Sequence, residues 1–271
     1  KGAVIFFHEN GNNELILAPV EHSLKQDEKE IVIDATKKEM STIKRELTSA
    51  SIKGYSVIKI IDSDLKKRAV EIRNELQNLM ALEIMEQTQS SVTARVLLNM
   101  PDIDLLALLR RMDTTVRTML TDLKDSLKDS SDSYSHLSYR DQDINRAYFV
   151  ILRITNGGME DSKLASALKL NAKDLFNFWS IAFYLENFGD EIKRIAELMS
   201  NTKLNKNTTE SVLKFLVEIE SAYLSVMKAY YTNDIDLALS YSDTRKKLFD
   251  KYKFYVEINR QPDNLIVISI C

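Results

Sequence analysis

The hydrophobic positions of the chain change their spacing near residue 100, and this change separates two differently built regions. Before it, short apolar runs alternate with helical stretches. The pattern predicts strands at 30–33, 56–61, 83–86 and 92–97, and helices at about 36–53 and 64–82. Thr36 and Glu39 have the spacing of a capping box that opens the first helix, and Gly54 ends it. We expect a small α+β region in the order β-α-β-α-β-β.

The first twenty residues predict a β-hairpin. Apolar runs at 4–7 and 15–17 flank the segment Glu9-Asn10-Gly11-Asn12-Asn13. Asn-Gly supplies the positive φ angles that a tight turn requires. Because an isolated hairpin is barely stable in water, we expect it to pair with further residues that the sequence lacks or with the next domain.

From Pro101 onward the apolar residues recur in steps of three and four, the period of amphipathic helices. The stripes that predict three long antiparallel helices are Leu109, Met112, Val116, Met119 and Leu123; Ile144, Tyr148 and Ile151; and Phe178, Ile181, Leu185, Phe188, Ile192, Ile195 and Met199. Asn171, with Asp174 three residues later, predicts the start of the third helix. A stripe from Val212 to Tyr230 and a turn at Asn233-Asp234 predict two more helices.

Composition narrows the class of protein. The 44% hydrophobic and 28% charged residues are typical of a globular chain, and only 6 Gly and 3 Pro argue against an all-β fold. A net charge of -3 provides no general attraction for nucleic acid. One cysteine, Cys271, excludes an internal disulfide, and we find neither a membrane-spanning run nor a signal peptide. We therefore expect a cytoplasmic protein without membrane insertion.

The sequence contains no motif that is typical of a catalytic site. The three histidines, His8, His22 and His136, lack the spacing of metal ligands, and the chain has neither a nucleophile motif nor a glycine-rich phosphate loop. We expect the protein not to be an enzyme.

A pair of carboxylates one helical turn apart is the strongest chemical signal. Glu186 and Asp190 share one helix face at the flank of the apolar stripe, so both can approach one cation. Asp141 and Asn145 form a matching turn on the preceding helix. If the two helices pack antiparallel, these four oxygen-bearing side chains converge and predict a site for a divalent metal ion.

Two alternatives need no metal. Acidic pairs at helical spacing are common on solvated faces, and Asp141 has the spacing to close a capping box with Ser138. Glu186 and Asp190 can also pair with Lys193 and Arg194. In the same segment, Gly189 is unfavourable within a helix and suggests a close backbone approach.

Two segments carry a family resemblance. The segment Tyr184 to Glu197, with Leu-Glu-Asn-Phe-Gly-Asp and Ile-Ala-Glu, resembles the Leu-Glu-Arg-Ile-Gly-Asp motif of PhoU proteins. Arg140 to Phe149 is similar to an Arg-Asp-x-Glu-Val-Asp-Arg-Leu-Tyr-Phe stretch of archaeal PhoU-like proteins. The resemblance implies a non-enzymatic regulator that restrains phosphate import by acting on a phosphate ABC transporter or its regulatory proteins.

The resemblance also implies the ligands of a metal ion, which can be Mg, Mn, Fe or Zn. Glu186, Asp190 and Asp141 match ligand positions of the family. Asn145 stands where the family usually has Asp, and Asn187 replaces the Arg of the motif. A neutral amide adds no charge, so the resemblance implies weaker metal binding in this chain.

With the family as a guide, we expect a mainly α fold of PhoU-like antiparallel three-helix bundle repeats, preceded by a small α+β region. The expected domains are a partial AbrB-like hairpin (1–20), the α+β domain (21–98), PhoU repeat one (99–202) and an incomplete repeat two (203–271). The apolar tail 265–271 lies where a sixth helix would begin, although as a sequence it also suits a strand.

Two alternative functions, and a possible homodimer, remain open. In archaeal relatives an AbrB-like module precedes the PhoU domain, so an AbrB/PhoU-type transcription regulator is one alternative; here DNA binding would require the missing N-terminal half of that module. A metal-free helical scaffold is the second alternative. A homodimer is compatible with either.

Overall fold

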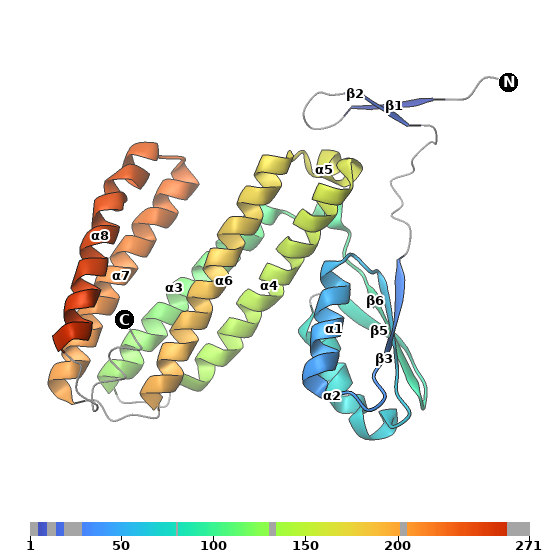
Figure 1. The fold of residues 1–271 in the computed structure, drawn as a ribbon, viewed down its shortest axis with the longest axis horizontal. Helices are drawn as coiled ribbons and strands as arrows, with labels where there is room; N and C mark the ends of the chain where they lie inside the picture. The colour runs from blue at the N-terminus through green and yellow to red at the C-terminus, as the bar shows by residue number, and fades with distance from the viewer. Residues whose placement is uncertain are drawn as a thin grey trace. The chain divides into compact units, whose positions relative to one another are not determined.

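The computed structural model describes residues 5–9, 15–18, 29–79, 81–129, 134–200 and 205–258 (Figure 1). By contacts, the chain divides into two compact units, Lys1–Arg110 with Asn145–Tyr184, and Arg111–Ile144 with Leu185–Cys271. The division passes through long helices, so each unit is described by itself. The predicted boundaries 1–20, 21–98, 99–202 and 203–271 stay a prediction.

The first unit begins with the hairpin that the sequence predicts. Strands β1 (Phe6–Glu9) and β2 (Leu15–Ala18) pair antiparallel, with Phe6 opposite Ala18 and Glu9 opposite Leu15. The predicted turn at 10–13 lies outside the described residues. Phe7, Leu15 and Leu17 are exposed. The likeness of this hairpin to half of an AbrB-like module stays a prediction.

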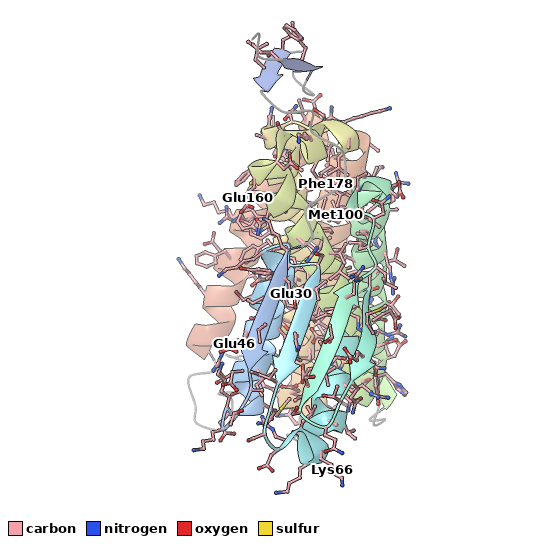
Figure 2. The ribbon with its side chains drawn as sticks, turned by 90° about the vertical axis from the view of Figure 1, so that its right-hand side faces the viewer. Glu30, Glu46, Lys66, Met100, Glu160 and Phe178 are labelled. Atoms are coloured by element: carbon pink, nitrogen blue, oxygen red, sulfur yellow. The ribbon has the colours of Figure 1, made fainter. Side chains whose placement is uncertain are left out.

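The predicted α+β region is confirmed. It comprises β3 (Glu30–Asp34), α1 (Met40–Ile52), β4 (Val57–Ile61), α2 (Leu65–Asn78), β5 (Leu82–Gln87) and β6 (Ser91–Val96). The strand order is β3-β4-β6-β5, with β3 and β4 parallel and the other pairs antiparallel. Figure 2 looks onto the face of the sheet away from α1 and α2, and Glu30 marks the start of β3. The fully buried side chains between the sheet and the helices include Ile43, Leu47, Ile58, Ile60, Ile72 and Leu76.

Two predicted helix ends are wrong. The capping box is absent: α1 starts at Met40 after an extended Glu39 whose side chain makes no cap bond, while the Asp34 carboxylate accepts the Thr36 N–H at 2.9 Å. This competing bond holds the segment after β3 in a turn. Helix α2 ends at Asn78 rather than near 82 because the next residue, Leu79, is extended. Gly54 ends α1 as predicted, with a φ of 82°.

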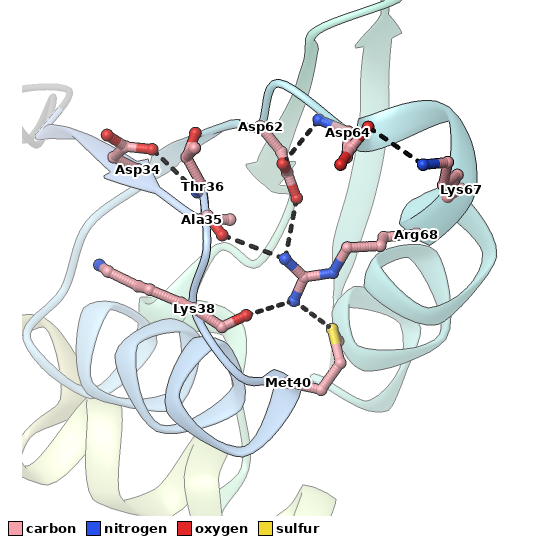
Figure 3. Close-up of polar contacts among 9 residues, drawn as sticks. All are labelled: Asp34, Ala35, Thr36, Lys38, Met40, Asp62, Asp64, Lys67 and Arg68. Carbon is pink, nitrogen blue, oxygen red and sulfur yellow. Dashed lines mark hydrogen bonds and ion pairs between the residues drawn. The ribbon is translucent and has the colours of Figure 1, made fainter.

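The turns that follow β3 and β4 are tied together by Arg68 of α2 (Figure 3). Its guanidinium donates to the carbonyls of Ala35 at 3.1 Å and Lys38 at 2.7 Å. It also donates to the Asp62 carboxylate at 3.1 Å, which is almost fully buried. A second oxygen of Asp62 accepts the Asp64 N–H at 2.9 Å. These polar groups satisfy one another, so the network stabilises the turns.

Helix α4 (Tyr134–Glu160) contacts the α+β region through residues on one face of its second half. The buried guanidinium of Arg153 donates to the carbonyls of Ser51 at 2.6 Å, Tyr55 at 3.0 Å and Gly54 at 3.2 Å. These carbonyls lie at and just beyond the C-terminus of α1, where a helix has unpaired acceptors and partial negative charge. Phe149 packs against the core of the same region. Burial lowers the pKa of Arg153.

The predicted three long helices after residue 100 are confirmed. After a 3-10 turn at Met100–Asp102 they are α3 (Leu105–Asp129), α4 and α6 (Ala172–Ser200). A short helix, α5 (Ser162–Leu168), lies between α4 and α6 and was not predicted. The start of α6 is a reciprocal cap in which Asn171 and Asp174 each accept the other's backbone N–H, at 3.0 and 3.1 Å. The chain is thus mainly α, with the α+β region ahead of the helical part, as expected.

In the second unit the predicted stripes form the core. Leu109, which begins the first stripe, belongs to the first unit; the other α3 positions, Met112, Val116, Met119 and Leu123, are buried together with Ile144, Leu185, Ile192, Ile195 and Met199. Helices α7 (Lys206–Thr232) and α8 (Ile235–Ile258) follow, and Asn233 turns the chain with a φ of 51°. The predicted tail at 265–271 lies outside the described residues.

Candidate functional site

Helix α6 presents the predicted carboxylates along one side. Glu186, Asp190 and Lys193 follow at steps of four and three residues within a continuous helix, so they lie one above the other. Glu186 and Asp190 are half-buried at the flank of the apolar stripe, because Leu185 and Ile192 turn into the core. The sequence therefore placed these two side chains correctly on the helix.

Gly189 allows α4 to approach this part of α6. An added Cβ at Gly189 would lie 2.8 Å from Cδ1 of Ile144 on α4 and 4.0 Å from the sulfur of Met119 on α3. The close approach that the sequence suggested is confirmed. Because Ile144 stands three residues after Asp141 on α4, this contact brings the Asp141 carboxylate to the acidic side of α6.

An ammonium group joins the carboxylates of the two helices. Lys193 Nζ donates to Asp141 Oδ2 at 2.7 Å and to Asp190 Oδ1 at 3.2 Å. The side chain of Asp141 is 7% exposed, that of Lys193 28% and that of Asp190 49%. We call Asp141, Glu186, Asp190 and Lys193 the acidic cluster. It links α4 to α6 through a charge-assisted contact that is closed on the Asp141 side and open on the Asp190 side.

The charges of the cluster perturb one another. Burial raises the pKa of Asp141; its bond to Lys193 lowers the pKa and the nearby Asp190 raises it, and the net direction is upward. Burial also raises the pKa of Glu186, and the charges of Asp190 and Asp141 raise it further. Burial alone lowers the pKa of Lys193, but its bonds to Asp141 and Asp190 outweigh burial and raise it. The carboxylates therefore repel one another, and Lys193 relieves part of that repulsion.

The fourth predicted ligand, Asn145, follows Ile144 on α4 and is half-buried. By its contacts it belongs to the other compact unit, so it is not counted in the acidic cluster. The alternative in which Asp141 closes a capping box with Ser138 is wrong, since both residues lie inside α4 rather than at its start. The predicted pairing of Glu186 and Asp190 with Lys193 and Arg194 is confirmed only in part. Asp190 pairs with Lys193, whereas Arg194 pairs with Glu191.

Carboxylate oxygens are suitable ligands for a hard divalent cation, but the positions of these side chains do not form a metal-binding site. Within the described ranges, no group of three or more His, Cys, Asp or Glu side chains is placed to hold a metal ion. The ammonium of Lys193 lies between two of the predicted ligands. Ligation of a metal by Glu186, Asp190, Asp141 and Asn145 stays a prediction.

A second polar cluster in the same unit was not predicted. Asp113 of α3 is buried and accepts from Arg117 at 2.9 and 2.8 Å and from the Tyr223 hydroxyl of α7 at 2.6 Å. The Tyr223 ring stacks on Phe188 of α6 with centroids 5.0 Å apart. One signal was available in the sequence: Tyr223 lies on the predicted apolar stripe from Val212 to Tyr230, where its hydroxyl needs a partner.

These features define an antiparallel helical bundle with acidic residues on adjacent helices. Residues 109–199 match the family model of the PhoU domain. The matched segment spans all but the first residues of α3, all of α4 and α5, and α6 to its penultimate residue, and contains the acidic cluster. Comparisons with curated proteins and with solved structures yielded no match. In the part of the chain that the structure describes, no helix combines the length and apolar character needed to cross a membrane.

Proposed function

We propose that this protein regulates phosphate uptake through its PhoU domain, by contact with a phosphate ABC transporter or with that transporter's regulatory proteins. The observation that carries the proposal is the PhoU match over residues 109–199. Regulation by protein contact requires no catalytic residues. It requires a surface on which a partner protein can bind.

An aromatic face on the first half of α6 supports such contact. Phe176, Trp179 and Phe183 recur at steps of three and four, with ring centroids 5.6 and 5.8 Å apart. Phe176 is 54% exposed, Phe183 39% and the adjoining Tyr184 69%. Aromatic side chains gathered on an exposed helix face are characteristic of protein interfaces. We assign the contact with the transport system to this α6 aromatic face.

The test measures uptake of radiolabelled phosphate in cells of the source organism at high external phosphate. Deleting the gene should raise uptake, and the wild-type gene should restore restraint. Unchanged uptake after deletion, with the transporter expressed, contradicts the proposed function.

The chain offers a matched pair of variants for the surface. Phe176→Ser should fail to restore restraint, whereas Phe249→Ser on α8, with the same exposure of 54%, should restore it. Equal restoration by both variants, at equal protein levels, would reject the aromatic face while leaving the regulatory function in place.

A further inference from the structure

The acidic cluster already contains a cation, because Lys193 Nζ lies within hydrogen-bond distance of carboxylates from both helices. One carboxylate, Asp141, comes from α4 and is almost completely enclosed. The other, Asp190, comes from the preceding turn of α6. A divalent ion shared by these two groups would occupy the same region between the helices.

Two cations cannot share this position. Oxygen ligands surround Mg²⁺ at about 2.0–2.1 Å and Ca²⁺ at about 2.3–2.6 Å, which demands lone pairs that point at the metal. Asp141 Oδ2 and Asp190 Oδ1 direct theirs toward the ammonium. A metal at this place also meets the positive charge of Lys193 without intervening water. Binding therefore requires the lysine side chain to leave.

We propose that Lys193 is a tethered cation that takes the place of a metal ion in the acidic cluster, so that a divalent ion enters only by displacing it. The lysine is held by its own helix and is always present at the site, which gives it a high effective concentration against a free ion. Its side chain is 28% exposed, so it has a route to solvent when displaced. The proposal does not depend on the role in phosphate uptake.

The arrangement also explains how three carboxylates stay close without a metal. Asp141 and Asp190 share the one ammonium, and Glu186, two helical turns before Lys193, also feels its charge. Removing that ammonium leaves the same oxygens facing each other with no positive charge between them. The vacated place then lies between two carboxylate oxygens from different helices, the type of ligand that hard divalent ions prefer.

Lys193→Met tests this, because methionine keeps an unbranched apolar stem and removes the ammonium. Arg194→Met is the matched control: it removes one positive charge from the next position of α6, where the partner is Glu191 and the side chain is 49% exposed. The probe is MnCl₂ alone. Binding is measured by the electron paramagnetic resonance signal of free Mn²⁺, and stability by thermal unfolding with and without EDTA.

In EDTA, Lys193→Met should melt below the wild type, and Mn²⁺ should restore its melting temperature by mass action. Its affinity for Mn²⁺ should exceed that of the wild type by about tenfold or more, equivalent to about 1.4 kcal/mol or more. Arg194→Met should bind Mn²⁺ as the wild type does. Equal Mn²⁺ affinity of Lys193→Met and the wild type, or no binding by the folded Lys193→Met chain, overturns the proposal.

If Lys193→Met does not fold, Lys193→Gln takes its place in the same measurements, because glutamine removes the charge and keeps a polar side chain. A gain of Mn²⁺ affinity over the wild type again supports the tethered cation, and an unchanged affinity overturns it. Stoichiometric binding of Mn²⁺ by the wild type at micromolar concentration, abolished in Asp190→Asn, overturns it.

Discussion

The contact between Gly189 of α6 and Ile144 of α4 allows a stability change to be worked out in sign and size. Alanine is more favourable than glycine within a helix by about 1 kcal/mol. At Gly189, however, the new Cβ would lie 2.8 Å from Ile144 Cδ1, and Ile144 is 1% exposed in the core. Forcing a methyl group into a packed core costs about 1–3 kcal/mol. Gly189→Ala should therefore lower the free energy of unfolding by about 0–2 kcal/mol.

The same substitution should reverse its sign when the opposing atom is removed. Ile144→Val deletes Cδ1 and alone costs about 0.5–1.5 kcal/mol. The next nearest atoms, Ile144 Cγ2 at 3.9 Å and the Met119 sulfur at 4.0 Å, are at ordinary contact distance. In the Ile144→Val background, Gly189→Ala should thus stabilise the chain by up to about 1 kcal/mol. The coupling between the two sites is then about 1–3 kcal/mol.

Urea denaturation of the four proteins measures this coupling, with the slope of the transition checked for constancy. If Gly189→Ala stabilises both backgrounds equally by about 1 kcal/mol, the helices do not approach closely at this point. The close contact between α4 and α6 at Gly189, on which the geometry of the acidic cluster depends, would then be refuted.

Three further predictions concern the core and the buried polar groups. Leu185→Ala, at a position 3% exposed, should cost about 2–5 kcal/mol in chemical denaturation, and a loss below about 0.5 kcal/mol would contradict its burial. Arg153→Met should cost about 1–3 kcal/mol by removing the side-chain donor to the carbonyls of Ser51, Gly54 and Tyr55, and hydrogen exchange should increase at the end of α1; an unchanged exchange rate would exclude the cap. Burial and the bond to Asp113 raise the pKa of Tyr223, so its stabilising effect is present below the ordinary value of 10.0 and is lost as pH rises through the higher folded value. Tyrosinate absorbance should accordingly show one fewer late-titrating group in Tyr223→Phe, and an identical alkaline titration would refute the assignment.

The long helices were predictable because each carries a stripe of several turns, which fixes both its period and its buried face. The short helix α5 has 7 residues, too few for a stripe to form. The predicted start of α1 was wrong because the spacing of Thr36 and Glu39 favoured a capping box. In the structure the Thr36 N–H donates instead to the carboxylate of Asp34. Such competition between two local bonds depends on backbone geometry that composition does not encode.

The sequence predicted which face of α6 carries the acidic residues, but not which residue of α4 lies opposite them. Spacing places Glu186 and Asp190 on one side of α6, yet the axial offset between α4 and α6 decides which α4 residue stands opposite them. That offset depends on the contact at Gly189, and it sets Asp141 against Lys193. The buried contact of Arg153 could have been suspected from the sequence, because Arg153 is a charged residue within the apolar run Val150-Ile151-Leu152-Arg153-Ile154. Hydrophobic periodicity alone does not detect it.

The contact of Arg153 with the end of α1 has a consequence for the α+β region as an isolated fragment or a graft. The described part of the predicted domain 21–98 contains a sheet and a core of its own. The carbonyls of Gly54 and Tyr55, just beyond the end of α1, nevertheless accept from a donor some hundred residues later, on α4. A fragment cut at residue 98 loses that donor and the packing of Phe149. Grafted onto another protein, the region would need a substitute donor for the carbonyls just beyond the end of α1.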